Sequence, residues 1–157
     1  MKELLAKYDT DKETHHHYGD SYDELFSVFD RNAHLKILEI GTQKGWSLIA
    51  MKKYFPNAQV SGIDIVDVVE HKRPGIEYIV DDVKNIKDDR EYDIVIDDGS
   101  HFLEDVLYTV NNFKAKLMVI EDCQNPEQWL SEIRKVKPEA YGIDLRGNYD
   151  DYLIVIK

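Results

Sequence analysis

The sequence predicts an α/β fold: a Rossmann-like, doubly wound, mostly parallel seven-stranded sheet that ends in an antiparallel hairpin. Short, β-branched apolar runs alternate with helical patterns along most of the 157-residue chain, which is typical of βαβ units and a parallel sheet. A glycine-containing turn joins the first strand to the first helix, where doubly wound sheets bind ligands. Two later apolar runs end in clusters of acidic residues, as expected at the open edge of such a sheet.

The first half of the core contains three expected strands and one helix. Residues 35–40 form an apolar strand, and the helix expected over residues 47–55 is stopped by Pro56 and Asn57. The second strand covers residues 59–65. The third covers residues 76–80 and is entered through Pro74 and Gly75.

The second half repeats this alternation and then departs from it. A strand over residues 92–96 precedes an amphipathic helix over 102–113, and a strand over 117–120 precedes a helix over 127–136 that is closed by Pro138. Strands over 141–145 and 152–156 flank the turn signal Gly147-Asn148. These last two strands predict the antiparallel hairpin.

Length and composition indicate a single domain over residues 1–157. It consists of an N-terminal helical segment over 1–33 and a Rossmann-like core over 34–157. Hydrophobic residues make up 43% and charged residues 32% of the chain, as in ordinary globular proteins. The single cysteine, Cys123, excludes an internal disulfide and fits a reducing compartment. Since no apolar run approaches the roughly 20 residues that span a membrane, and no signal peptide is recognisable, we expect a cytoplasmic protein without membrane partners.

The charge balance bears on the partners of the protein. A formal net charge of −11 argues against nucleic-acid binding, because phosphates attract a basic surface. We therefore expect a small-molecule ligand, with a homo-oligomer as a possible assembly.

Four acidic residues follow two of the predicted strands. Asp97 and Asp98 end the apolar run that begins at Asp93, and Glu121 and Asp122 end the run that begins at Lys116. If the two strands are parallel and adjacent, these carboxylates meet at one edge of the sheet, with His101 beside them. Like charges gather in this way only when a cation or a proton holds them together. The pattern therefore indicates a divalent metal ion with a histidine base nearby.

The glycine turn indicates a nucleotide-like ligand. Gly41 and Gly45 allow the backbone to approach a ligand closely, and the following helix directs its first amides at it. Asp64, at the end of the second strand, suits the two hydroxyls of a ribose. The spacing is not G-x-G-x-x-G, which disfavours a dinucleotide. The alternative is an ordinary strand-to-helix turn with a surface aspartate.

These residues resemble two nested families. The turn Glu39-x-Gly41-Thr42-x-x-Gly45-x-Ser47, followed by Asp64 and Asp82, resembles class I S-adenosylmethionine-dependent methyltransferases. Residues 9–18, together with Asp-Asp-Gly-Ser-His over 97–101 and Glu-Asp over 121–122, are similar to the metal-dependent sugar O-methyltransferases of the macrocin and mycinamicin type. Rhamnosyl O-methyltransferases and the cephalosporin hydroxylase group are relatives of these enzymes.

The resemblance implies a role for each matching residue. S-adenosylmethionine would contact Glu39, Gly41, Thr42, Gly45, Ser47, Asp64, Asp82, Asp97, Thr14 and Tyr18. Magnesium, or another divalent cation, would be held by Asp98, Glu121 and Asp122, and His101 would be the general base. Residues 14–18 would form part of a lid; the alternative is that the histidines at 15–17 lie in a polar loop.

The sequence thus predicts an S-adenosylmethionine-dependent, Mg²⁺-assisted O-methyltransferase that acts on a hydroxyl of a sugar or sugar-containing metabolite. A divalent cation lowers the pKa of a bound hydroxyl, and His101 can accept the proton near neutral pH. Three alternatives are a methyltransferase for a catechol-like diol, a non-catalytic cofactor-binding module, and an NAD-dependent dehydrogenase. The missing G-x-G-x-x-G and the C-terminal hairpin disfavour the dehydrogenase.

Overall fold

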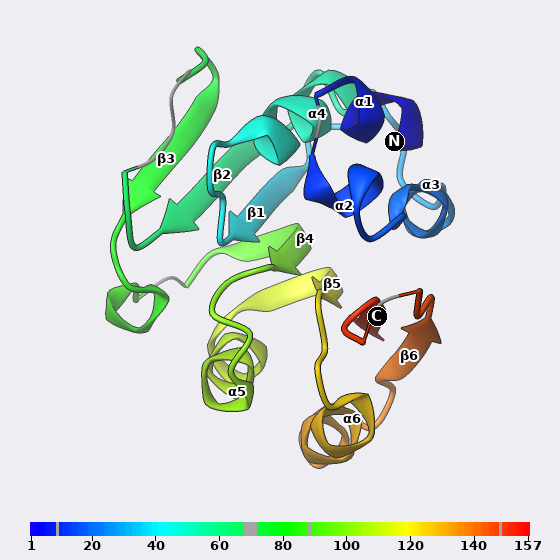
Figure 1. Ribbon diagram of the computed structural model, residues 1–157. Helices are drawn as coiled ribbons and strands as arrows, with labels where there is room; N and C mark the ends of the chain where they lie inside the picture. The colour runs from blue at the N-terminus through cyan, green and yellow to red at the C-terminus, as the bar shows by residue number, and fades with distance from the viewer. Residues whose placement is uncertain (9, 68–71, 88, 148) are drawn as a thin grey trace.

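The computed structural model describes residues 1–8, 10–67, 72–87, 89–147 and 149–157, which form a sheet covered by helices (Figure 1). The described strands make one seven-stranded sheet in the order β3-β2-β1-β4-β5-β7-β6. This order confirms the predicted doubly wound architecture. Asp9 of the N-terminal motif and Asn148 of the predicted hairpin turn lie outside the described residues.

Five strands are parallel and two are antiparallel. The parallel strands are β1 (Lys36–Ile40), β2 (Gln59–Asp64), β3 (Ile76–Val80), β4 (Glu91–Asp97) and β5 (Lys114–Ile120). The hairpin strands are β6 (Tyr141–Asp144) and β7 (Tyr152–Ile156). Strand β7 lies between β5 and β6 and is antiparallel to both. The predicted C-terminal hairpin is therefore confirmed.

The helices of the core follow the predicted pattern. They are α4 (Trp46–Tyr54), α5 (Leu103–Asn112) and α6 (Pro126–Arg134), with a short 3₁₀ helix, η1 (Val83–Asn85), after β3. Helix α6 begins one residue before its predicted start, because Pro126 occupies a first-turn position where a missing N–H costs no hydrogen bond. Residues 1–33 contain three short helices, α1 (Lys2–Lys7), α2 (Asp11–Thr14) and α3 (Gly19–Phe26).

The sheet is buried on both faces, as a parallel sheet must be. Successive residues of β4 point to opposite faces: Ile94 and Ile96 join the cluster formed with Phe26 of α3, whereas Val95 joins the cluster formed with Ile133 of α6. The N-terminal helices and α4 therefore cover one face, and α5 and α6 cover the other (Figure 1).

None of the helices in the described ranges is long and apolar enough to cross a membrane.

Ile94 lies at the centre of the sheet, between β1 and β5, and is fully buried. We expect Ile94→Ala to reduce the free energy of unfolding by about 2–5 kcal/mol, because the lost methyl groups leave a cavity that the sheet cannot fill. Urea denaturation measures this loss. Val28→Ala is the matched control: Val28 is 72% exposed, so its replacement should change stability by no more than about 0.5 kcal/mol.

Candidate active site

The carboxyl ends of β4 and β5 bring the predicted acidic residues together. The two strands are parallel and adjacent, with Asp97 paired with Ile120. Asp98 and Glu121, which follow these two residues, therefore lie at the same edge of the sheet. The Glu121 amide donates to the Asp97 carbonyl at 2.9 Å, which continues the pairing into the loops. Asp98, Glu121 and Asp122 therefore lie at one edge of the sheet, as the sequence predicts.

A buried lysine lies among these acids. Lys12, on α2, is 3% exposed, and its Nζ lies 2.5 Å from Asp98 Oδ2 and 2.9 Å from Glu121 Oε1. Glu39 Oε1, at β1, lies 3.2 Å from the same nitrogen. Burial alone lowers the pKa of Lys12, but the three surrounding carboxylates raise it well above its usual value. Lys12 is therefore a permanent cation within the acid cluster.

Burial acts in the opposite sense on the acids. It raises the pKa of Glu39 to about 7, although Lys12 and a 2.6 Å hydrogen bond from Ser47 oppose the shift. Burial also raises the pKa of Glu121, whose Oε1 accepts hydrogen bonds from both Lys12 and Tyr22. Part of the negative charge at this edge is thus balanced by Lys12 and the rest calls for protons or a further cation.

A second group, of two acids and a histidine, lies on the open side of the cluster. Asp98, His101 and Asp122 each offer one potential metal-ligand atom, and these three atoms lie within 4.8 Å of one another. His101 Nε2 is 4.0 Å from Asp98 Oδ1 and 3.9 Å from Asp122 Oδ2, and 29% of the His101 side chain is exposed. Carboxylate oxygens and an imidazole nitrogen are ligands of divalent metals. Asp98 and Asp122 therefore fit a metal ion, and the partly exposed His101 lies beside them, where it can act as a ligand or as a base.

The backbone at this group is unusual. His101 has φ +56° and Asp122 has φ +54°, in the left-handed region that non-glycine residues rarely adopt. His101 lies four residues after the end of β4 and Asp122 two residues after the end of β5, so both left-handed residues lie in loops at the carboxyl edge of the sheet. Such conformations occur most often where a site requires them.

The glycine turn lies against the same edge. Gly41 has φ +79°, and a Cβ at this position would lie 1.9 Å from the Asp98 carbonyl oxygen. Only glycine permits both the conformation and this approach. Asp64 Oδ2 accepts hydrogen bonds of 2.9 Å from the Thr42 and Gln43 amides, so this carboxylate also holds the turn in place.

Two cavities flank Gly41 and Asp98, which line both. The first, of about 240 Å³, has polar walls from α2 and the glycine turn, including Thr14, Thr42 and Ser47. The second, of about 400 Å³, is more apolar. Its lining includes Ile63, Ile65, Val66, Val83, Asp64, Asp82, Asp97 and His101. An elongated ligand with an amino-acid end and a nucleoside end fits this pair of cavities.

Asp97 provides a test of that fit. Its Oδ2 is buried and has no hydrogen-bond partner at normal geometry. Burial raises the pKa of Asp97 to about 6, and the neighbouring Thr109 side chain opposes the shift. An unpaired buried carboxylate oxygen costs free energy unless a donor reaches it. The cavity wall therefore offers an acceptor for a donor or cationic group of a ligand, as S-adenosylmethionine would supply.

The remaining predicted cofactor residues lie in different surroundings. Thr14 lines the first cavity and donates to the Thr10 carbonyl at 2.9 Å. Asp82 lines the second and accepts the Lys84 amide as the cap of η1. Gly45, with φ +79°, precedes α4 and lines the first cavity. Tyr18 lines neither of these cavities; it is buried, and its hydroxyl donates to Asp122 Oδ1 at 2.7 Å.

Three residues of the site have no role in the sequence-based prediction: Lys12, Tyr22 and His16. Lys12 and His16 lie in the N-terminal motif, but its spacing does not show that α2 and the following loop pack on the edge of the sheet. His16 Nε2 lies 3.5 Å from Asp122 Oδ2. Tyr22 lies on α3 at helical spacing from the apolar residues Leu25 and Phe26, which indicates a core position.

Comparisons with known proteins identify relatives of the chain, although no family model matches it. The chain is 31% identical over 167 residues to 8-demethyl-8-alpha-L-rhamnosyl tetracenomycin-C 2'-O-methyltransferase of Streptomyces olivaceus, covering 94% of this chain and 40% of that protein. It is 32% identical over 120 residues to mycinamicin VI 2''-O-methyltransferase of Micromonospora griseorubida, covering 64% of this chain and 29% of that protein. The chain thus spans less than half the length of these curated relatives.

Solved structures show the same fold. The MycE methyltransferase from the mycinamycin biosynthetic pathway, in complex with Mg and SAH, has a TM-score of 0.75 and 25% identity over 99% of this chain and 53% of its own. The plantazolicin methyltransferase BpumL has a TM-score of 0.65 over 99% of this chain and 89% of its own, at 16% identity, which supports the fold alone. The resemblance expected from the sequence is confirmed.

The close approach at Gly41 is open to a direct test. We expect Gly41→Ala to reduce the free energy of unfolding by about 3–5 kcal/mol, because it combines left-handed strain with an overlap against Asp98. Gly75→Ala is the matched control: Gly75 has φ +81°, but its added Cβ would meet no atom closer than 3.6 Å. Gly75→Ala should cost only about 1–2 kcal/mol in urea denaturation. Equal losses would contradict a specific role for the approach.

The buried cation gives a second prediction. Lys12→Met leaves Glu39, Asp98 and Glu121 without their shared partner, so we expect a loss of about 3–5 kcal/mol in the free energy of unfolding. Added MgCl₂ should raise the melting temperature of Lys12→Met more than that of the wild type, because a divalent ion replaces the lost charge. Lys53→Met, at an exposed position of α4, is the control and should be nearly neutral. Wild-type stability of Lys12→Met would refute the role assigned to Lys12.

Proposed function

We propose that this chain, which has the fold of a class I S-adenosylmethionine-dependent methyltransferase, transfers a methyl group to a hydroxyl of a sugar or a sugar-containing small molecule. The observation that carries the proposal is the position of Asp98, His101 and Asp122 beside the two cavities that share Gly41. A methyl donor in the cavities and an acceptor at the acidic group would meet there. The named activities of the two curated relatives support the substrate class.

The proposed cofactor orientation follows from the character of the cavities. The methionine end would lie in the polar cavity beside Thr14, Gly45 and Ser47, and the adenosine end in the cavity lined by Ile65 and Val66. Ile65 is 72% exposed without a ligand, and an adenine ring would cover part of its apolar surface. Asp64 and Asp82 line the same cavity and would accept hydrogen bonds from the nucleoside.

The proposed metal ligands are Asp98, Asp122 and Glu121, with His101 as the general base. When bound, a divalent cation supplies a Lewis acid that acidifies the acceptor hydroxyl, and S-adenosylmethionine supplies an electrophilic methyl group. His101 would accept the hydroxyl proton at Nε2, which faces Asp98 and Asp122. The two carboxylates would then stabilise the imidazolium that forms. Holding the acceptor oxygen near the methyl group supplies the remainder of the rate.

Lys12 divides the acids between two tasks. Its ammonium group contacts Glu39 Oε1, Asp98 Oδ2 and Glu121 Oε1, whereas Asp98 Oδ1 and Asp122 Oδ2 face His101. A cation bound on the His101 side would therefore add to the charge of Lys12 rather than replace it. We infer that Lys12 keeps the acid cluster assembled before the metal arrives.

Cofactor identity can be tested by calorimetry. We expect S-adenosylmethionine to bind and NAD to show no binding, because the turn lacks the dinucleotide spacing. Transfer of a labelled methyl group to a panel of sugars and catechol-like diols then identifies the acceptor class. Binding of NAD alone would contradict the proposal, and full activity in EDTA would refute the metal requirement.

The roles of His101 and Asp98 can be separated from one another. We expect His101→Asn, which tolerates the left-handed conformation, to lower kcat at least about 100-fold while Mg²⁺ and cofactor affinities stay near the wild-type values. Asp98→Asn should instead weaken Mg²⁺ binding, measured by calorimetry. His34→Asn, remote from both cavities, is the control. A loss of Mg²⁺ affinity in His101→Asn would show that His101 is a ligand and not the base.

A further inference from the structure

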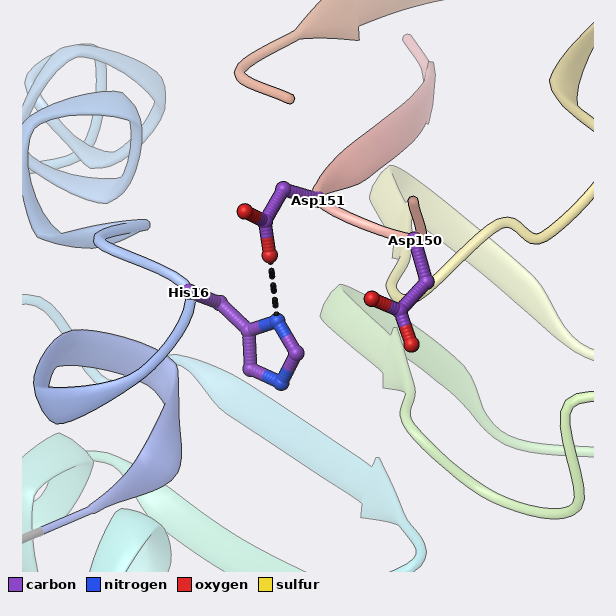
Figure 2. Close-up of side chains that lie close together, drawn as sticks. All are labelled: His16, Asp150 and Asp151. Carbon is purple, nitrogen blue, oxygen red and sulfur yellow. Dashed lines mark hydrogen bonds and ion pairs between the residues drawn. The ribbon is translucent and has the colours of Figure 1, made fainter. Parts of the chain in front are cut away.

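A second cluster of potential metal ligands lies beside the proposed active site. One donor atom each from His16, Asp150 and Asp151 can be chosen so that all lie within 4.8 Å of one another. His16 comes from the loop between α2 and α3, and the two aspartates directly precede β7. Figure 2 shows the three side chains converging from these two segments. The cluster is distinct from Asp98 and His101, which follow β4.

The imidazole of His16 is oriented as in a metal ligand. Its Nδ1 lies 2.7 Å from Asp151 Oδ1, and a carboxylate at this distance accepts a proton from Nδ1. Asp151 is 2% exposed, and its Oδ2 accepts the Gly147 amide at 3.0 Å. The Nε2 atom lies on the other side of the ring, away from Asp151. Histidines that bind metals commonly donate their other nitrogen to a carboxylate in this way.

The second ring nitrogen, Nε2, lies near a further carboxylate. His16 Nε2 lies 3.5 Å from Asp122 Oδ2, and the Asp150 carboxylate lies beside the ring (Figure 2). The same Asp122 oxygen is 3.9 Å from His101 Nε2. Asp122 therefore lies between the two clusters, and a carboxylate in this position can bridge two ions.

The local charge also favours a second cation. Asp122, Asp150 and Asp151 surround His16, while the Lys12 ammonium is directed at three other carboxylates. In the described part of the chain, the basic side chains paired with Asp122 are His16 and His101. Stacking on Tyr18, with ring centroids 5.2 Å apart, holds the His16 ring in place. The group is thus largely buried and rich in oxygen ligands.

We propose that His16 and Asp150 hold a second divalent cation beside Asp122, with Asp151 as the residue that orients His16. Nitrogen and oxygen donors together favour Mn²⁺, Co²⁺ or Zn²⁺ over Mg²⁺, which prefers oxygen alone. The site goes beyond the proposed function, in which one divalent cation acts at Asp98, Glu121 and Asp122. An ion here would lie next to the first and offer a second point of attachment for an acceptor with adjacent oxygens.

Manganese stoichiometry tests this site independently of activity. The full chain, freed of metal with EDTA, is titrated with MnCl₂, and free Mn²⁺ is followed by its electron paramagnetic resonance signal. We expect two ions per chain in the wild type and one in His16→Ala and in Asp150→Asn. Asp151→Asn should weaken the second ion roughly 10–100-fold. His17→Asn is the matched control: His17 is exposed with φ +58°, asparagine tolerates this conformation, and two ions should remain.

The outcomes distinguish this site from the proposed function. One ion per chain in the wild type, retained in His16→Ala and lost in Asp98→Asn, would overturn the second site and leave the proposed function standing. In that case the contact between His16 and Asp151 only joins the N-terminal segment to the hairpin. Two ions in both His16→Ala and Asp150→Asn would also overturn it. If circular dichroism shows that His16→Ala is unfolded, Asp150→Asn decides the result.

Discussion

The pairing of Lys12 with three buried carboxylates is the constraint on which the rest of the site depends. It joins α2 to Glu39 on β1, to Asp98 after β4 and to Glu121 after β5. Charges that lose contact with water need a partner of opposite sign, so the N-terminal helices cannot separate from the sheet without exposing or neutralising these acids. The same contacts place Thr14 in the wall of the polar cavity. One ammonium group therefore both assembles the acids and positions the segment that borders them.

Backbone conformation is a second feature that shapes the site. Left-handed residues gather at the carboxyl edge of the sheet: Gly41 and Gln43 in the glycine turn, His101 after β4 and Asp122 after β5. Each lies in a loop that follows the carboxyl end of a parallel strand. Strain of this kind persists only where the surrounding contacts hold it. Here the contacts are the Asp64 bonds to the turn and the close passage of Gly41 past Asp98.

Much of the fold could be predicted because local patterns determine it. The expected ranges of β3 and β7 agree with the structure, since each is a short apolar run between turn residues. The acids also lay where predicted, because parallel strands expose their carboxyl ends at one edge. Lys12 was not predicted as a site residue: a lysine in a polar segment carries no local sign that it will be buried. The contact of His16 with Asp151, 135 residues further along the chain, had no local sign either.

The sequence by itself determined the alternation of strands and helices, the need for glycine at the turn, and the acids that follow β4 and β5. These features depend on residues close together in the chain, where period, turn preference and propensity operate. Only the tertiary structure decided which basic side chains meet these and other acids. The insertion of β7 between β5 and β6 carries Asp150 and Asp151 to His16, and the packing of α2 carries Lys12 to three acids. Those pairings arise from sheet order and from the free-energy cost of unpaired buried charge, which no local pattern encodes.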